Sequence, residues 1–498
     1  MKRIATAALA AAVLLPAGAR AQRIDTMEIR SSTYFLASDL LLGRDTGSPG
    51  SHVAALYLSS ELQRLGLKPV GADGSYLLPV PLKAARLDNL GTRLVVRRGA
   101  DTVAFASGRD FVVNQGGATA FHDFTGDAVL VGSAEEADHA VPSGSLQGKV
   151  LVVLGGLGAE ARRLVPDWSR RGAAGIVTLV PDEESLQQFI RSRGDVRYYI
   201  DAPVEDAVWE PALPSIIAGP AIVRVLLAGA VIPDSVLRGK ALDHAVPLGR
   251  AIAATIRTQV SAVAAADVAG LVPGRDPARR DEVVVFTAHY DHLGISTPNA
   301  RRDSIYNGFS DNAAGDGMLL AIAGAMIKDP PARSVLFLFP TGEERGLLGS
   351  TYYATHPAIP LARTIAEINL DAGAPPAPPT SWAFAGGTTS GLGQLASRIV
   401  QGHGWKSVLG AASPNSDYWP FLQRGVPAIF IKPGPDWEGV GPEEKKALLA
   451  RWEHYHDPAD EWSPDFPFRG LQRYAEVGLE LGRAVADAPA RPTLAASP

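Results

Sequence analysis

The chain has 498 residues, of which 46% are hydrophobic and 20% are charged, a balance typical of soluble globular proteins and long enough for two domains. Its formal net charge of −5 gives no reason to expect nucleic acid or an anionic membrane as a partner. The absence of cysteine excludes disulfides, thiolate zinc ligands and cysteine nucleophiles.

The first 21 residues have the pattern of a signal peptide. Lys2 and Arg3 are basic, residues 4–15 form an apolar run too short to span a bilayer, and Ala19-Arg20-Ala21 fits a cleavage site. We expect cleavage after Ala21 and export to the periplasm or the extracellular space, with an uncleaved anchor as the alternative. No later apolar stretch is long enough for a span, so we expect no membrane contact of the mature chain.

Residues 22–119 read as the opening of a globular domain. Ser48-Pro49 can start a helix, apolar residues recur at helical spacing as far as Leu65, and Gly66 is placed to end it. Residues 79–114 alternate apolar and polar residues around turn signals, which predicts strands.

The composition changes near residue 120. Residues 120–250 contain short β-like runs separated by glycine, proline and acidic turns, and their histidines are isolated. We therefore expect a smaller, inserted β-rich α+β domain here, with continuation of one large sheet as the alternative.

The strand pattern resumes at residue 251. Three short apolar runs, at 283–286, 335–339 and 365–370, have the length and the β-branched or aromatic content of buried strands. A buried helix is predicted over 313–327 and an amphipathic helix over 468–487. Residues 488–498 are rich in proline, alanine and serine and are expected to form a flexible tail.

Each of the three apolar runs is followed by side chains that can bind metal. His289 and Asp291 follow the first, Glu343 and Glu344 the second, and Asp371 the third. Ligands of open α/β sheets lie beyond the carboxyl ends of the strands, so we expect these groups to converge. The predicted fold is α/β, with a mixed, mostly parallel central sheet flanked by helices.

Together with Asp311 and a later histidine, these residues predict a two-metal centre. Imidazole and carboxylate without sulfur suit zinc, cobalt or manganese, and crowded carboxylates repel one another unless cations neutralise them. One carboxylate can bridge two ions, and one of the adjacent glutamates is left over as a general base. Asp291 can orient the His289 ring. His292 and His454 compete with His456 for the second histidine position.

Six motifs in order resemble the co-catalytic zinc aminopeptidases and related carboxypeptidases of the M28 peptidase family: HYDH, SDNAAG, TGEERGLLGS, NLDAG, SDYWPF and YHDPADE. The resemblance implies the zinc-exopeptidase fold and two Zn²⁺ ions, with Co²⁺ or Mn²⁺ as alternatives. It implies Glu343 as general base and Tyr455 as a group that stabilises the oxyanion. It also implies five metal ligands, with Asp311 as the bridge: His289, Asp311, Glu344, Asp371 and His456.

The middle of the chain is similar to the protease-associated domain inserted in some members of this family. The residue patterns and the resemblance, which covers residues 28–110 and 262–485, together divide the chain into a signal peptide (1–21), a catalytic domain in two parts (22–119 and 251–487), the insert (120–250) and the tail (488–498).

The expected function is that of an exported di-zinc aminopeptidase acting on peptides. Carboxypeptidase or dipeptidase action on the same scaffold is an alternative, and Arg345, Arg424 and Lys432 are candidates for the cationic clamp that it needs. A single-zinc glutaminyl-cyclase-like transferase and a metal-free binding protein are the remaining alternatives. The oligomeric state is not predicted.

Overall fold

The computed structural model describes residues 24–114, 122–133, 145–155, 159–193, 196–203, 213–230, 245–296, 298–299, 301–371 and 373–495. The predicted signal peptide lies outside these ranges. No helix within them has both the length and the apolar character needed to cross a bilayer.

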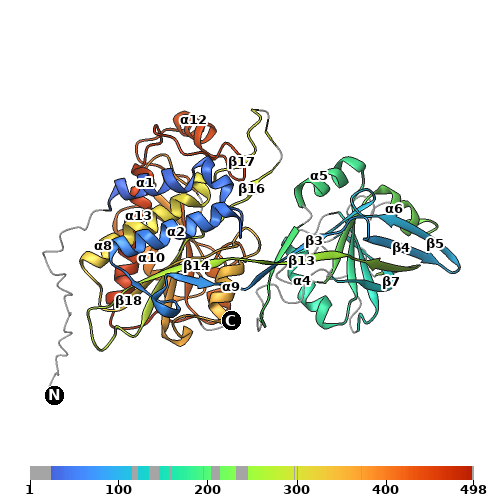
Figure 1. Ribbon diagram of the computed structural model, residues 1–498, viewed down its shortest axis with the longest axis horizontal. Helices are drawn as coiled ribbons and strands as arrows, with labels where there is room; N and C mark the ends of the chain where they lie inside the picture. Colours follow the sequence, from blue (N-terminus) through green and yellow to red (C-terminus); the bar gives the residue numbers. More distant parts are fainter. Residues whose placement is uncertain are drawn as a thin grey trace, which may run out of the picture.

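The described chain forms two bodies joined by long strands (Figure 1). The first body is built on a nine-stranded mixed sheet in the order β1-β14-β18-β15-β19-β22-β20-β21, with β2 pairing to β14. The four strands β18, β15, β19 and β22 at its centre are parallel. The strands are β1 (Lys68–Pro69), β2 (Leu77–Pro79), β14 (Ala266–Val272), β15 (Val283–Thr287), β18 (Ser334–Phe339), β19 (Thr364–Leu370), β20 (Ser381–Ala385), β21 (Lys406–Leu409) and β22 (Ala428–Pro433).

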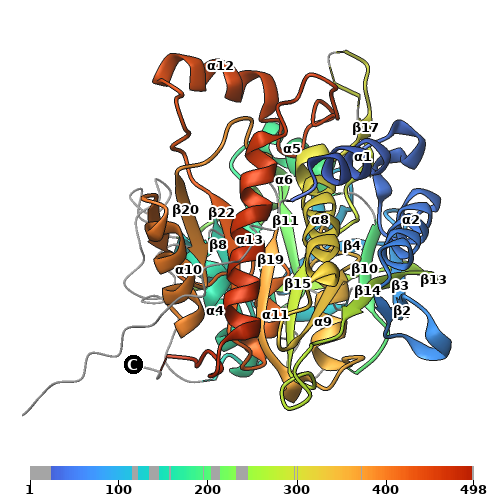
Figure 2. The same cartoon turned by 90° about the vertical axis from the view of Figure 1, so that its left-hand side faces the viewer.

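Helices cover both faces of this sheet (Figure 2), which confirms the predicted fold class. Because successive strand residues point to opposite faces, Val284 and Phe286 of β15 pack under one helix layer while Val283 and Val285 pack under the other. One layer contains α1 (Thr26–Leu36), α2 (Pro49–Leu65), α8 (Ala314–Lys328), α10 (Gly391–Gly402) and α13 (Arg469–Asp487). The other contains α9 (Leu348–Thr355) and α11 (Tyr418–Gln423).

Short elements complete the first body. They are η1 (Asp39–Arg44), η2 (Ala72–Gly74), η3 (Phe309–Ala313), η4 (Leu361–Arg363), β16 (Gly294–Ile295), β17 (Ile305–Tyr306) and α12 (Pro442–Trp452). The predicted start and stop of α2 are both present. The Ser48 side chain accepts a hydrogen bond from the Ser51 amide, and Gly66 ends the helix at φ 84°.

The second body contains an eight-stranded sheet in the order β5-β4-β12-β7-β8-β9-β11-β6 and a three-stranded sheet β10-β3-β13. Its helices are α4 (Ala159–Arg170), α5 (Glu183–Arg193) and α6 (Pro220–Leu227). Its strands are β3 (Leu82–Leu87), β4 (Arg93–Arg98), β5 (Asp101–Ala106), β6 (Phe111–Val113), β7 (Phe124–Ser133), β8 (Lys149–Leu154), β9 (Gly175–Leu179), β10 (Val196–Ile200), β11 (Ser215–Ala218), β12 (Val246–Thr255) and β13 (Thr258–Val263).

The predicted boundaries of the insert at residues 120 and 250 are wrong. Strands β4 and β12 pair with each other in the second body, with Arg97 opposite Ala251, and β13 pairs with β3. The second body therefore runs from β3 to β13. The local pattern of a strand does not reveal its partner, so β4, β5 and β6 were indistinguishable in sequence from strands of the first body.

Residues 488–495 do not form the free tail that their composition predicts. Arg491 pairs with Glu282 at 2.6 Å, and Ala495 donates a backbone hydrogen bond to Thr389. These contacts hold the segment on the first body.

Candidate metal centre

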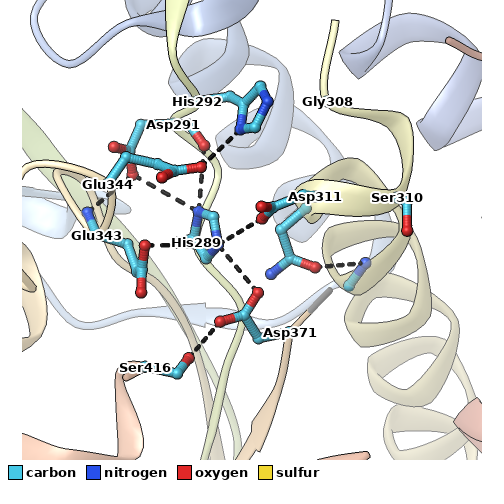
Figure 3. A network of polar contacts seen from close by, with 12 residues as sticks. His289, Asp291, His292, Gly308, Ser310, Asp311, Glu343, Glu344, Asp371 and Ser416 are labelled. Atoms are coloured by element: carbon cyan, nitrogen blue, oxygen red, sulfur yellow. Dashed lines mark hydrogen bonds and ion pairs between the residues drawn. The ribbon is translucent and has the colours of Figure 1, made fainter. Parts of the chain in front are cut away.

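The ends of three neighbouring parallel strands meet at one edge of the first body's sheet. His289 follows β15, Glu343 and Glu344 follow β18, and Asp371 follows β19 directly. Two further groups come from outside the sheet, Asp311 from η3 and His456 from the segment between α12 and α13. Figure 3 shows His289, Asp311, Glu343 and Asp371 pointing toward one another.

Asp311 lies between two histidine–carboxylate groups. Its Oδ1 is 3.2 Å from Nε2 of His289, which is also 3.1 Å from Oδ1 of Asp371. Its Oδ2 is 3.2 Å from Nε2 of His456, which is 3.3 Å from Oε2 of Glu344. The structure therefore brings all five predicted ligands together, in two groups that share one aspartate.

Glu343 lies beside the first group. Its Oε2 is 4.0 Å from Nε2 of His289, and the ligand atoms of His289, Glu343 and Asp371 all lie within 4.8 Å of one another. Imidazole and carboxylate at this spacing form a donor set that fits zinc.

Burial concentrates negative charge at the centre. The side chains of Asp311, Glu344 and Asp371 are 4%, 6% and 7% exposed. Burial raises the pKa of Glu343 well above its usual value, against the attraction of His289 and with the help of Asp371. Divalent cations relieve this kind of crowding.

Glu344 differs from its neighbour in pKa. Burial and Asp311 favour its protonated form, but hydrogen bonds with His292 and His456 outweigh them and lower its pKa to about 2. Glu344 is thus held as a carboxylate, the form that binds metal, whereas Glu343 has the higher proton affinity of the two.

Asp291, which we expected to orient the His289 ring, contacts that ring through its backbone. Nδ1 of His289 lies 3.1 Å from the Asp291 backbone oxygen and 3.8 Å from its carboxylate. The carboxylate instead accepts hydrogen bonds from the Glu343 amide at 3.1 Å and from the Thr46 hydroxyl at 3.0 Å. Asp291 therefore orients His289 through its backbone and supports the Glu343 turn with its side chain.

The contacts of His454 and His292 distinguish these two histidines from His456. His454 bonds through Nε2 to the Arg451 carbonyl at 3.0 Å. His292 is buried, and its Nδ1 lies 2.7 Å from Oε1 of Glu344. Its ligand atoms also lie within 4.8 Å of those of Asp311 and Glu344, so His292 either supports Glu344 or adds a ligand.

Tyr455 stacks on the ring of His456, with centroids 3.9 Å apart and planes at 15°, and its side chain is largely exposed beside the centre. Of the clamp candidates, Arg345 is paired with Asp45 at 2.6 Å, and Lys432 Nζ lies 4.4 Å from the ring centroid of Phe430.

Three supporting residues were not assigned a role from the sequence. Ser416 donates a short hydrogen bond to Asp371, and the buried Asp460 accepts from the Ser310 and Asp311 amides at 2.9 and 3.1 Å. Arg44 is fully buried and donates to the carbonyls of Tyr290 and Gly308. Ser416 and Asp460 lie in the motifs SDYWPF and YHDPADE. Their position as polar residues within these motifs was the sign of a role that the sequence offered.

Parts of the chain are similar in sequence to known proteins. The Aminopeptidase YwaD of Bacillus subtilis (strain 168) is 28% identical over 192 residues, which are 36% of this chain and 36% of that protein. A probable zinc metalloprotease of Pyrenophora tritici-repentis (strain Pt-1C-BFP) is 35% identical over 79 residues, 16% of this chain and 15% of that protein. Both alignments span well under half of the relative's length.

A solved structure shares the fold of the chain. The aminopeptidase from Aneurinibacillus sp. strain AM-1 aligns with a TM-score of 0.54 and 17% identity over 96% of this chain and 97% of that chain. Residues 267–481 match the family model described as Peptidase family M28, and this segment contains all five predicted ligands. The segment 267–481 is therefore similar to the peptidases of family M28.

Proposed function

We propose that the chain is an exported di-zinc aminopeptidase that removes N-terminal residues from peptides. The observation that carries this proposal is the position of Asp311 between the His289–Asp371 and His456–Glu344 groups, with Glu343 at the side. The names of two similar proteins, an aminopeptidase and a probable zinc metalloprotease, support a zinc-dependent peptide hydrolase.

Zinc would be held by the two groups, with Asp311 shared between them. When bound, two zinc ions polarise a carbonyl and lower the pKa of a water molecule toward neutrality. Glu343 takes a proton from the attacking water and passes it to the leaving amine. Its amide is held by Asp291, which fixes the carboxylate at the centre, and Tyr455 stabilises the oxyanion that develops on the carbonyl.

The outer parts of the chain fit this role. The second body, similar in sequence to a protease-associated domain, borders the peptidase body, and residues 1–21 direct export. Arg345 is committed to Asp45, which removes one of three candidates for binding a substrate carboxylate and favours aminopeptidase over carboxypeptidase action.

Replacing the base tests the mechanism. Glu343→Gln keeps the size of the side chain and cannot accept a proton, so kcat should fall by about 10²- to 10⁴-fold while zinc content stays unchanged. The matched variant Glu344→Gln should instead lose zinc, because its carboxylate is a ligand. The measurements are turnover of aminoacyl p-nitroanilides and metal analysis of the purified proteins.

Near-normal turnover by Glu343→Gln would refute the assignment of the base. A peptide panel with free and blocked termini separates the alternatives, since aminopeptidase action requires a free α-amine. Cleavage of N-blocked peptides would contradict the proposed specificity, and one zinc per chain would favour a cyclase-like transferase.

A further inference from the structure

The strand β10 of the second body contacts the peptidase body next to the turn that carries Glu343 and Glu344. Residues two apart on a strand share a face, so Tyr198 and Ile200 point the same way and Tyr199 points the other way. Ile200 lies in a buried apolar cluster with Leu348, the first residue of α9, and Tyr198 packs against the same cluster. In Figure 1, α9 lies on the side of the first body that faces the second.

Tyr198 also covers the residue that follows the glutamate pair. The guanidinium carbon of Arg345 lies 5.5 Å from the centroid of the Tyr198 ring, within the range of a cation–π contact. One face of β10 therefore contacts two residues that follow the glutamate pair, Arg345 and Leu348.

Arg345 is held on its other side by the first body. Its Nε and Nη2 donate to Oδ1 of Asp45 at 2.9 and 2.6 Å, and Nη2 lies 3.4 Å from the Leu293 carbonyl. The side chains of Arg345 and Asp45 are only 27% and 29% exposed, and an ion pair that is partly shielded from water is stronger than one on the surface. The ring of Tyr198 contributes to that shielding.

The turn is held by its own hydrogen bonds and by Asp291, and Arg345 links it further to Tyr198 and Asp45. The Glu343 carbonyl accepts hydrogen bonds from the Gly346 and Leu347 amides, both at 2.9 Å, and the Glu343 amide donates to Asp291. A shift of Arg345 therefore moves the backbone of both glutamates.

We propose that Tyr198, a residue of the inserted body, is a positioning residue for Glu343 and Glu344 that acts through Arg345 and Asp45. For its effect on turnover this inference rests on the proposed function. Its effect on zinc binding requires only that Glu344 is a ligand. The inserted body is then part of the machinery that places the base, besides bordering the site.

Three variants on one strand test the proposal. Tyr198→Leu removes the π face, Tyr198→Phe keeps it, and Tyr199→Leu makes the same change on the opposite face of β10. We expect Tyr198→Leu to lower kcat by about threefold to tenfold with little change in KM, and to weaken zinc binding by a similar factor. Tyr198→Phe and Tyr199→Leu should stay within about twofold of the wild type.

A double-mutant cycle identifies the route. In an Arg345→Met background, Tyr198→Leu should cause no further loss, because the residue through which it acts is absent. Turnover is measured with an aminoacyl p-nitroanilide, zinc affinity by competition with a chromogenic chelator, and folding of each variant by its melting temperature.

The result that would overturn the proposal is a Tyr198→Leu variant that matches Tyr199→Leu in both kcat and zinc affinity. A change in KM alone would also overturn it, because Tyr198 would then be a substrate contact. The proposal would also be overturned if Tyr198→Leu lowered kcat and zinc affinity as strongly in the Arg345→Met background as it does in the wild type. If the wild type cleaves no peptide substrate, the proposed function fails, and the zinc-affinity comparison still decides the role of Tyr198.

Discussion

Three consecutive residues each support a different part of the metal centre. Arg44 donates to the Tyr290 and Gly308 carbonyls, Asp45 pairs with Arg345, and Thr46 donates to Asp291. Arg44 has φ 51°, and the glycine before it fits only without a side chain, since a Cβ on Gly43 would lie 2.4 Å from the Gly294 carbonyl oxygen. The segment is thus built for close approach to the loops that carry the ligands.

The buried Asp417 gives a pH prediction at the scale of a single residue. Burial raises its pKa to about 7, with Asp371 adding to the shift and His289 opposing it. In the unfolded chain this carboxyl titrates near its ordinary pKa of 3.8, so between about pH 4 and 7 the native state binds more protons than the unfolded state. Its contribution to stability is therefore favourable at low pH and is lost as pH rises through this window.

Asp417→Asn removes that titration and keeps the shape of the side chain. Relative to the wild type, the variant should gain on the order of 4 kcal/mol of unfolding free energy between pH 4 and pH 8. Urea unfolding of both proteins with a chelator present measures the difference. Parallel stability curves across this range would show that Asp417 does not titrate in it.

Single elements were predictable where their signal is local. The sequence predicts strands at 283–286, 335–339 and 365–370, and the structure has them at Val283–Thr287, Ser334–Phe339 and Thr364–Leu370. The closing helix is predicted at 468–487 and observed at Arg469–Asp487. Buried apolar runs and amphipathic periodicity are properties of neighbouring residues, so they can be read without knowing the partners.

The packing of α13 against the sheet gives a prediction at the scale of an element. A Cβ on Gly482 would lie 2.4 Å from the Phe286 ring, which is itself fully buried in β15. Gly482→Ala should therefore destabilise the protein by on the order of 1–3 kcal/mol, because the helix or the ring must move.

Gly402 provides the matched control. It is the last residue of α10, and a Cβ there meets no atom within 4 Å. Gly402→Ala should leave the melting temperature unchanged or raise it slightly, because alanine favours the helix. Equal melting temperatures for the two variants would contradict the described packing of α13.

The relation between the two bodies was not predictable from local patterns. β4 pairs with β12, and β10 returns from the second body to α9 of the first. These contacts join segments that are distant in sequence, so neither the limits of the insert nor the position of Tyr198 beside Arg345 could be inferred from the residues around them.

In the metal centre, too, some residues could be predicted from the sequence and others could not. The five predicted ligands lie at strand ends or within the six sequence motifs, and the structure brings them together. The groups that orient them, such as Arg44, Ser416 and Asp460, act through carbonyls, amides and short hydrogen bonds. A polar residue in a loop gives no sign of such a partner until the fold is known.

The measurement that tests the central claim most directly is anomalous diffraction at the zinc edge from crystals of the purified protein. We expect two peaks on opposite sides of the Asp311 carboxylate, one beside His289 and Asp371 and the other beside Glu344 and His456. A single peak, or peaks away from these five side chains, would contradict a shared two-metal centre.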